Sequence, residues 1–555
     1  MKNKEKVPFF KIRAAEYQFS QKKPSSFTDE ELGKWLSRHY INLIAEGAGI
    51  EEQFSYFTPS LKTKFGIYSF FHVGIGGRGV AEDGFLNGVV SDEYLKAHPQ
   101  FSSYDRGKTA LWGANPVLCF RTKIGRKKYK EWIKELVNRH PYAKEIIIYF
   151  GDFRGICGDN CPRCKMDSYP ERIVEIMKFL THEAKKINPE LRLSTQTWML
   201  DGAKEINELI KIMPEGIGVQ MNEPALEKRG SKGNQDNYLH IYELDEEIGP
   251  VFLSGAKKLG DDFSALTPLG DSCEIVDPAI GIPFPWTVAK RIRRLAENKI
   301  KNIYIWWGIS PWVYCINHEI FAKMVFDPFC NIDLLIKEIA LRDFGPRAKK
   351  EVLALWKAVE KAFSKWEIYN WFERLEEYTA YTRKGPFEIS LTKKGLRNQQ
   401  WQNYGHNWKA RGQICPLVKE NWLEKNYEGL IKTHFRLNQG LYKALGYAKK
   451  VCKLVIPEGR KRARQQYLWL KLLYHLFLSE YHYIRAIGFE IGKRVNQKKN
   501  ICEEIKNCKQ ILKVIDELGD EINNIRAFPA NLNKFSIEQE KEVIRKKIKA
   551  MRESR

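Results

Sequence analysis

Eight short apolar runs, each long enough for a β-strand, occupy the first 325 residues of the chain, and helix-like segments separate them. The predicted strands cover residues 9–17, 40–45, 65–72, 145–150, 192–198, 216–221, 250–255 and 302–307. Amphipathic stretches such as 128–138 and 172–186 lie between several of them. This alternation indicates repeated βα units around a parallel sheet. Eight units in about 300 residues predict a (β/α)8 TIM barrel, with a doubly wound sheet as the alternative.

The texture of the sequence changes after about Phe326. Long helix-like stretches with few β-branched runs follow. We therefore expect a catalytic barrel over 1–325 and a mostly α-helical C-terminal domain over 326–555. Residues 385–416 are rich in Gln, Asn, Trp and Gly and predict an irregular insertion, and insertions of this length are usually functional or disordered.

The sequence contains no apolar run of the roughly 18 residues that cross a bilayer, and its N-terminal residues lack the apolar core of a secretory signal. The eleven cysteines are scattered except for one group, unlike those of a disulfide-stapled secreted domain. We therefore expect a cytoplasmic protein with no membrane partner.

The formal charge of +24 is unevenly distributed. Residues 1–325 carry 46 basic and 41 acidic side chains (+5), whereas 326–555 carry 46 and 27 (+19). A basic domain can attract phosphate groups, but no nucleic-acid-binding motif accompanies the charge. The favoured partner is therefore an acidic oligosaccharide. We expect Trp401 and Arg411 of the insertion to contact it, because arginine binds carboxylates in a bidentate manner and tryptophan stacks on sugars.

Chemistry in a TIM barrel collects at the C-terminal ends of the strands. There the sequence places three candidate catalytic carboxylates: Asp152, Glu223 and Asp262. It also places candidate substrate-binding residues there, namely Glu46, His72, Arg78, Trp198, Asn222, Trp306, Trp307 and Trp312. Paired carboxylates cleave acetals and aromatic faces stack on sugar rings, so this combination predicts glycoside hydrolysis.

Several segments carry a resemblance to a known group. These are YLKAHPQF at 94–101, the run from NPVLCF at 115, IIIYFGDFRGICGDNCPRCKMD at 146–167, INPELRLSTQTW at 187–198, and the stretch from WWGISPW at 306. They resemble an uncharacterised group of glycoside hydrolase barrels related to α-glucuronidases and to family 20 β-N-acetylhexosaminidases. The match is good over about 90–200 and 300–365, and elsewhere it extends only to the order of elements.

The resemblance implies that Asp152 is the acid that follows the fourth strand, and that Cys161 and Cys164 are the paired cysteines of the group. Family 20 enzymes have an adjacent Asp-Glu pair at this strand end, whereas Phe153 follows Asp152 here. This difference argues against a substrate-assisted acetamido mechanism.

Two of the three candidate carboxylates are the preferred catalytic pair. Aromatic neighbours of Asp152 favour a raised pKa and therefore the role of proton donor. Glu223, beside the Asn222 amide, is the preferred partner, and Asp262 is the next choice.

The cysteine group Cys157-x3-Cys161-x2-Cys164 permits three interpretations. Its spacing matches the [4Fe–4S] ligands of radical S-adenosylmethionine enzymes. It also suits a structural zinc site, with Cys119 or a histidine as the fourth ligand. The third interpretation is a tight turn with free thiols, and the expectation is no cofactor, with zinc or an iron–sulfur cluster as alternatives.

The function predicted from the sequence is hydrolysis of glycosidic bonds in oligosaccharides, including those that contain uronic acids or hexosamines. One alternative is a radical iron–sulfur enzyme. Another is a non-catalytic protein that binds carbohydrate or nucleic acid.

Overall fold

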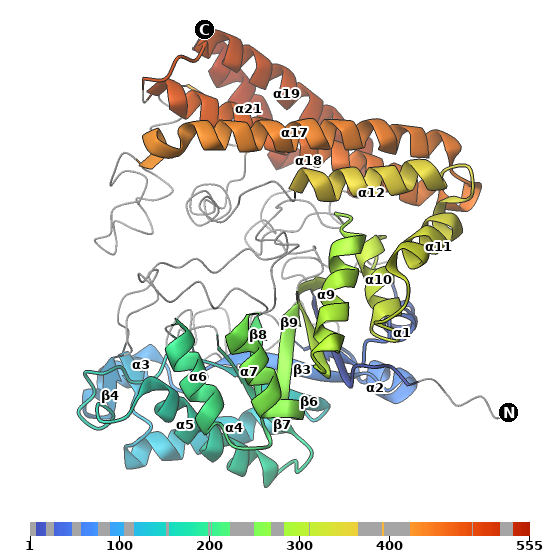
Figure 1. Ribbon diagram of the computed structural model, residues 1–555. Coiled ribbons are helices and arrows are strands. Elements are labelled where there is room, and N and C mark those ends of the chain that lie inside the picture. Colours follow the sequence, from blue (N-terminus) through green and yellow to red (C-terminus); the bar gives the residue numbers. More distant parts are fainter. Residues whose placement is uncertain are drawn as a thin grey trace, which may run out of the picture.

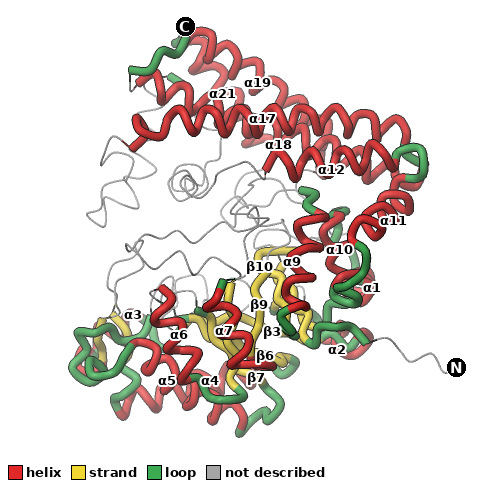
Figure 2. The backbone as a smooth tube through the Cα atoms, viewed as in Figure 1, coloured by secondary structure: helices red, strands yellow, loops and turns green. Residues whose placement is uncertain are grey.

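The computed structural model describes residues 7–17, 27–46, 57–75, 89–104, 116–150, 155–197, 200, 202–222, 249–267, 282–309, 311–363, 391–392, 422–490, 492–521 and 537–554. Strands gather at one end of the molecule with helices around them, and long helices form the other end (Figures 1 and 2). The insertion at 385–416 lies outside the described residues, apart from Leu391 and Thr392.

Eight parallel strands close into a barrel in the order β1-β10-β9-β8-β7-β6-β3-β2. They are β1 (Ile12–Tyr17), β2 (Leu43–Ala45), β3 (Tyr68–Gly74), β6 (Ala143–Tyr149), β7 (Arg192–Gln196), β8 (Ile217–Asn222), β9 (Phe263–Thr267) and β10 (Asn302–Ile309). The predicted (β/α)8 barrel is confirmed. A small antiparallel pair, β4 (Ser102–Tyr104) and β5 (Pro116–Leu118), lies outside it.

Helices follow the strands and cover the outer face of the barrel. They are α1 (Asp29–Arg38), α2 (Pro59–Phe65), α4 (Lys123–Arg139), α5 (Tyr169–Lys185), α6 (Gly202–Ile212), α7 (Pro250–Leu259), α9 (Pro285–Glu297) and α10 (Ile316–Met324). The short helix α3 (Asp92–Ala97) packs instead against β5 of the small antiparallel pair. Local sequence explains where they begin. In α5, for example, Ser168 caps the backbone of Glu171 while the Glu171 side chain returns to the backbone of Ser168.

Seven of the eight predicted strands overlap observed strands, and the one at 250–255 is wrong. These residues begin helix α7, with Gly249 at the N-cap and Pro250 in the first turn. The seventh barrel strand in chain order is instead the buried run β9, which begins at Phe263.

The C-terminal part is helical, as predicted. It contains α11 (Ile332–Phe344), α12 (Lys349–Phe363), α17 (Trp422–Leu454), α18 (Arg460–Glu490), α19 (Gln497–Leu518) and α21 (Ile537–Glu553). Successive helices pack on one another from α12 to α21, and α11 also contacts α9 of the barrel (Figure 1). None of the helices within the described residues combines the length and apolar character needed to cross a bilayer.

Candidate functional site

The C-terminal ends of β6, β7 and β8 lie side by side on one rim of the barrel. These strands are neighbours in the order β8-β7-β6, and they pair in register from Ile148 through Thr195 to Val219. Asp152 follows the end of β6 in sequence and Glu223 directly follows β8, but both lie outside the described residues. Their pairing therefore stays a prediction.

A polar group lies in the barrel interior toward this rim. The Gln196 side-chain nitrogen is 3.4 Å from His72 Nε2 and donates to Gln220 Oε1 at 3.2 Å. Both glutamines are buried, whereas His72 is partly exposed. The structure thus brings the predicted residue His72 together with two amides that the sequence analysis did not single out. For Gln220 the sequence signal was a polar residue between the apolar residues Val219 and Met221 of β8, whereas β7 is polar at most of its positions and gives no such signal for Gln196.

The His72 imidazole is desolvated by the surrounding protein, which lowers its pKa to about 4. The ring is therefore neutral at neutral pH. A neutral imidazole offers one donor and one acceptor, and together with the amides it can bind hydroxyl groups without carrying a charge.

A second polar layer lies deeper in the barrel, and Glu145, Ser194 and Tyr304 in it are buried while Arg192 is partly exposed. Glu145 on β6 accepts hydrogen bonds from Ser194 on β7 and from the Tyr304 hydroxyl on β10. Arg192 Nη1 lies 3.7 Å from Glu145 Oε2. Burial and the nearby Glu145 carboxylate raise the pKa of Tyr304 well above its usual value. This closed network stabilises the barrel from within, below the rim where substrate would bind.

Asp262 lies at the opposite end of the barrel from the predicted active rim. It ends a 3₁₀ turn (Gly260–Asp262) directly before β9. Its carboxylate accepts a hydrogen bond of 2.6 Å from the backbone N–H of Gly216, which directly precedes β8. Asp262 therefore connects the N-terminal ends of two strands, and its assignment as a catalytic candidate is wrong.

Glu46 lies on the outer face of the barrel. Its backbone N–H donates to Phe70 O, which places it about midway along β3, and its carboxylate is 3.2 Å from His140 Nδ1. The His140 ring lies 4.2 Å from that of Phe71, a member of the large cluster between strands and helices. Strand β2 is short, so the residue after it does not reach the rim, and Glu46 does not face the predicted site.

The remaining substrate-binding candidates divide into two sets. Trp312 follows β10 and packs partly buried between the barrel core and the helical core, with its ring 6.0 Å from that of Phe27. Its observed contacts are those of a packing residue. Four of them lie outside the described residues, namely Arg78, Trp198, Trp401 and Arg411. For three others the backbone is described but the side chain is not, namely Asn222, Trp306 and Trp307.

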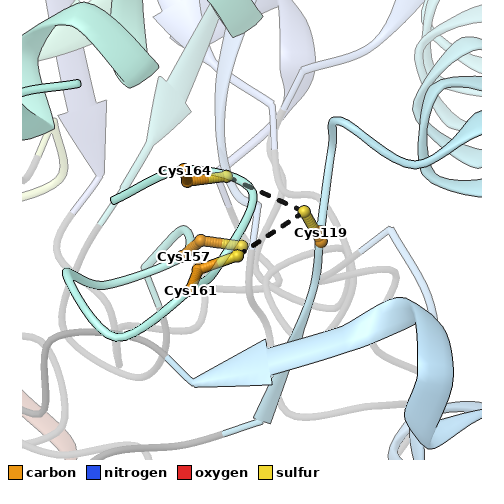
Figure 3. A group of neighbouring side chains, drawn as sticks. All are labelled: Cys119, Cys157, Cys161 and Cys164. Carbon is orange, nitrogen blue, oxygen red and sulfur yellow. Dashed lines mark hydrogen bonds between the residues drawn. The ribbon is translucent and has the colours of Figure 1, made fainter. Parts of the chain in front are cut away.

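Four cysteines lie close together on two loops, one of which follows the C-terminal end of β6 (Figure 3). Cys119 lies on the loop between β5 and α4, and Cys157, Cys161 and Cys164 lie on the loop between β6 and α5. All four are buried, and their sulfur atoms lie within 4.8 Å of one another. Hydrogen bonds with Cys157 and Cys164 hold the pKa of the Cys119 thiol well below its usual value. Such a group of thiols can hold a metal ion.

Backbone hydrogen bonds hold both cysteine loops in place. Cys164 N donates to Cys161 O at 3.1 Å, and Cys119 N donates to Phe101 O at 2.9 Å. The buried Arg172 guanidinium on α5 donates to Cys157 O at 2.8 Å. A side chain at Gly125 would put a Cβ only 2.0 Å from Cys119 O, so glycine is required there.

The four-cysteine arrangement argues against the radical S-adenosylmethionine interpretation. In such enzymes three cysteines bind three irons of a cluster and leave the fourth iron open to the cofactor. Here Cys119 supplies a fourth thiol, and the four sulfur atoms are too close together to enclose four irons and four sulfides.

No family model matches the chain. A search of curated proteins also found no match. Among solved structures, the chain is similar to a GH138 enzyme targeting pectin rhamnogalacturonan II. The identity is 11%, the alignment covers 99% of this chain and 84% of that one, and the TM-score is 0.56.

Two further solved structures align at lower TM-scores. An O-GlcNAc hydrolase mutant from Thermobaculum terrenum is 10% identical, with 98% of this chain and 94% of that one covered and a TM-score of 0.42. A family 89 glycoside hydrolase from Clostridium perfringens is 12% identical, with 99% and 64% covered and a TM-score of 0.44. At these identities the similarity concerns the fold alone, and the relationship to α-glucuronidases and family 20 enzymes stays a prediction.

Proposed function

We propose that the chain is a glycoside hydrolase whose catalytic carboxylates are Asp152 and Glu223. The observation that carries the proposal is the strand order, in which β6 and β8 flank β7 in a closed parallel barrel. The two acids follow these strands in sequence, Asp152 three residues after Tyr149 and Glu223 one residue after Asn222.

The spacing of the strands suits this chemistry. Neighbouring strands lie about 4.8 Å apart, so the ends of β6 and β8 are separated by about 10 Å. Side chains that lean toward each other across β7 reduce that distance. Glycosidases hold their two carboxyl groups about 5 to 9.5 Å apart, the shorter distances in retaining enzymes and the longer ones in inverting enzymes.

Asp152 is the proposed proton donor, since aromatic residues precede and follow it and an apolar setting raises the pKa of a carboxyl group. Glu223 is the proposed base or nucleophile. His72, Gln196 and Gln220 form a neutral polar floor suited to sugar hydroxyls. Trp198, Trp306 and Trp307 are the proposed stacking surfaces.

The proposed substrate is an oligosaccharide that includes acidic sugars. The excess of +19 on residues 326–555 would attract it, and Arg78 and Arg411 would bind its carboxylates. The GH138 enzyme with the same fold targets a pectin glycan, which is consistent with a carbohydrate substrate here.

The test is a panel of aryl glycosides that includes glucuronides and N-acetylhexosaminides. We expect turnover of at least one, and a fall of about 10²- to 10⁴-fold in Asp152→Asn and in Glu223→Gln, the usual contribution of acid–base groups. Asp261→Asn is the matched control, because this exposed carboxylate pairs with Lys11 at the opposite end of the barrel. Turnover by both variants at the wild-type rate would refute the assignment, and sugar binding without turnover by the wild type would indicate a non-catalytic protein.

A further inference from the structure

We propose that Cys119, Cys157, Cys161 and Cys164 form a structural zinc site that joins two neighbouring loops of the barrel. The sulfur geometry carries this inference. Cys119 Sγ lies 3.8 Å from Cys161 Sγ and 3.7 Å from Cys164 Sγ. Zinc bound to four thiolates at about 2.3 Å in a tetrahedron requires neighbouring sulfur atoms about 3.8 Å apart.

Disulfide bonds do not account for this geometry. A disulfide brings two sulfur atoms to about 2.05 Å, and all four cysteines are free. The Sγ–Sγ distances of 3.8 and 3.7 Å from Cys119 to Cys161 and to Cys164 are instead those expected around one shared ion.

The donor set favours zinc over other metals. Four thiolates in a tetrahedron select zinc or iron and disfavour calcium and magnesium, which take oxygen ligands. The small separation of the sulfur atoms admits a single ion and leaves no room for a [4Fe–4S] cluster. A single iron would fit the same tetrahedron, and the experiment below distinguishes it from zinc.

The surroundings indicate a structural site. All four cysteines are buried, and four protein ligands leave no open position for water or substrate, whereas catalytic zinc keeps one. The loops are held by their own hydrogen bonds, including the one from Arg172 to Cys157 O. Arg121 strengthens the junction, since it donates to Arg163 O at 3.1 Å and pairs with Glu175 at 2.8 Å.

The zinc ion would thus fix the loop after β5 to the loop after β6. Cys119 lies one residue beyond the end of β5, and Cys157 lies at the start of the segment that leads into α5. Without the ion, four thiols would share one apolar pocket, and the two loops would be held by hydrogen bonds and packing alone. We expect the ion to stabilise the fold.

The experiment measures metal in the full-length protein purified without a metal-affinity column. Elemental analysis is expected to find about one zinc per chain and little iron. Removing zinc with a chelator should expose four additional reactive thiols and lower the thermal midpoint. Cys119→Ser and Cys164→Ser should each lose most of the zinc, whereas Cys502→Ser, a partly exposed cysteine on α19, should retain it.

A second measurement tests the site in the wild-type protein, so that the test does not depend on whether the cysteine variants fold. The chelated wild-type protein is titrated with Co²⁺, which should bind at one equivalent with the intense thiolate-to-metal absorption of a tetrahedral four-sulfur site, and zinc should displace it. Stoichiometric iron with the red absorption of an iron–thiolate centre would overturn the assignment to zinc. A wild-type protein that contains no metal and binds neither Co²⁺ nor Zn²⁺ would overturn the site itself.

Discussion

Tyr304 on β10 donates its hydroxyl group to Glu145 on β6, on the opposite wall of the barrel. Three strands lie between β10 and β6 around the ring in either direction, so this hydrogen bond crosses the interior. Both residues are almost completely buried. The barrel therefore contains a polar crosslink that lies next to interior apolar residues such as Phe70, Ile147 and Leu266.

Removing this hydroxyl is expected to destabilise the barrel. Tyr304→Phe leaves the buried Glu145 carboxylate with one donor fewer, at a cost of about 1–3 kcal/mol. Urea unfolding measures the change. Tyr442→Phe on α17 is the control, because Tyr442 is exposed and its loss of a hydroxyl group should be almost neutral. Equal stability of the two variants would contradict the role of the crosslink.

The last helix is joined to the bundle by a buried ion pair. Lys547 on α21 contacts Glu504 on α19, which also accepts from Ser479 Oγ at 2.6 Å and lies 2.8 Å from His482 Nδ1. Although burial alone would raise the pKa of Glu504, Lys547 and His482 hold it well below its usual value. The carboxylate is therefore ionised and depends on these partners.

Replacing Lys547 is expected to be costly. Lys547→Met takes the lysine partner away from a fully buried carboxylate, and breaking a buried ion pair in this way typically destabilises a protein by about 3–5 kcal/mol. Lys546→Met removes an exposed neighbour paired with Glu542 and should change stability by less than about 1 kcal/mol. Adding Glu504→Gln to Lys547→Met should recover part of the loss. Unfolding curves that fail to separate the two lysine variants would rule out this explanation.

Glu360 makes stability depend on pH. Burial raises its pKa to about 7, although hydrogen bonds from Thr287 N and Oγ1 oppose the shift. Between its ordinary value of 4.5 and about 7, the folded state holds a proton that the unfolded state has lost. Stability from this group is therefore complete below pH 4.5 and declines as the pH rises to 7.

The decline is expected to be of order 3 kcal/mol, since one unit of pKa corresponds to about 1.4 kcal/mol. Glu360→Gln keeps a carbonyl oxygen for Thr287 and should remove this part of the pH dependence. The measurement is the unfolding free energy of both proteins from pH 4.5 to 7.5. Parallel curves for the two proteins would contradict the raised pKa.

His72 has the opposite effect on stability. Its folded pKa of about 4 lies below the ordinary value of 6.5, so the unfolded state gains the proton first as the pH falls. Stability from this group is complete above pH 6.5 and declines as the pH falls to 4. His72→Gln should remove the decline, and the His72 ring should show no NMR titration above about pH 5. A titration midpoint near 6.5 would refute the desolvated environment.

The architecture could be predicted from the sequence because strands buried on both faces form distinct apolar runs. The run at Ile146–Ile148 in β6 is an example. The strand prediction at 250–255 was wrong because a short buried apolar run fits a helix as well as a strand. The Pro at its start and the apolar spacing through Gly255 suit a helix. Because of this error the sequence prediction placed Asp262 after a strand, whereas in the structure Asp262 directly precedes strand β9.

Side-chain direction and depth could not be predicted in the same way. Glu46 follows a strand, but β2 ends well below the rim and the carboxylate points outward to His140. Cys119 was only one option for a fourth ligand, because its place beside Cys161 depends on how two separate loops fold together. Polar residues that meet across the interior, such as Glu145 and Tyr304, are joined only by closure of the barrel.

Closure between β1 and β10 also has a consequence for synthesis of the chain. The first strand pairs with the last one from Ile12 opposite Asn302 to Tyr17 opposite Ile309. During translation the edge of β1 that pairs with β10 remains unpaired until the residues of β10 have been synthesised and have left the ribosome. An exposed strand edge invites pairing with other chains. The edge of the sheet therefore stays open to such pairing until Ile309 has emerged.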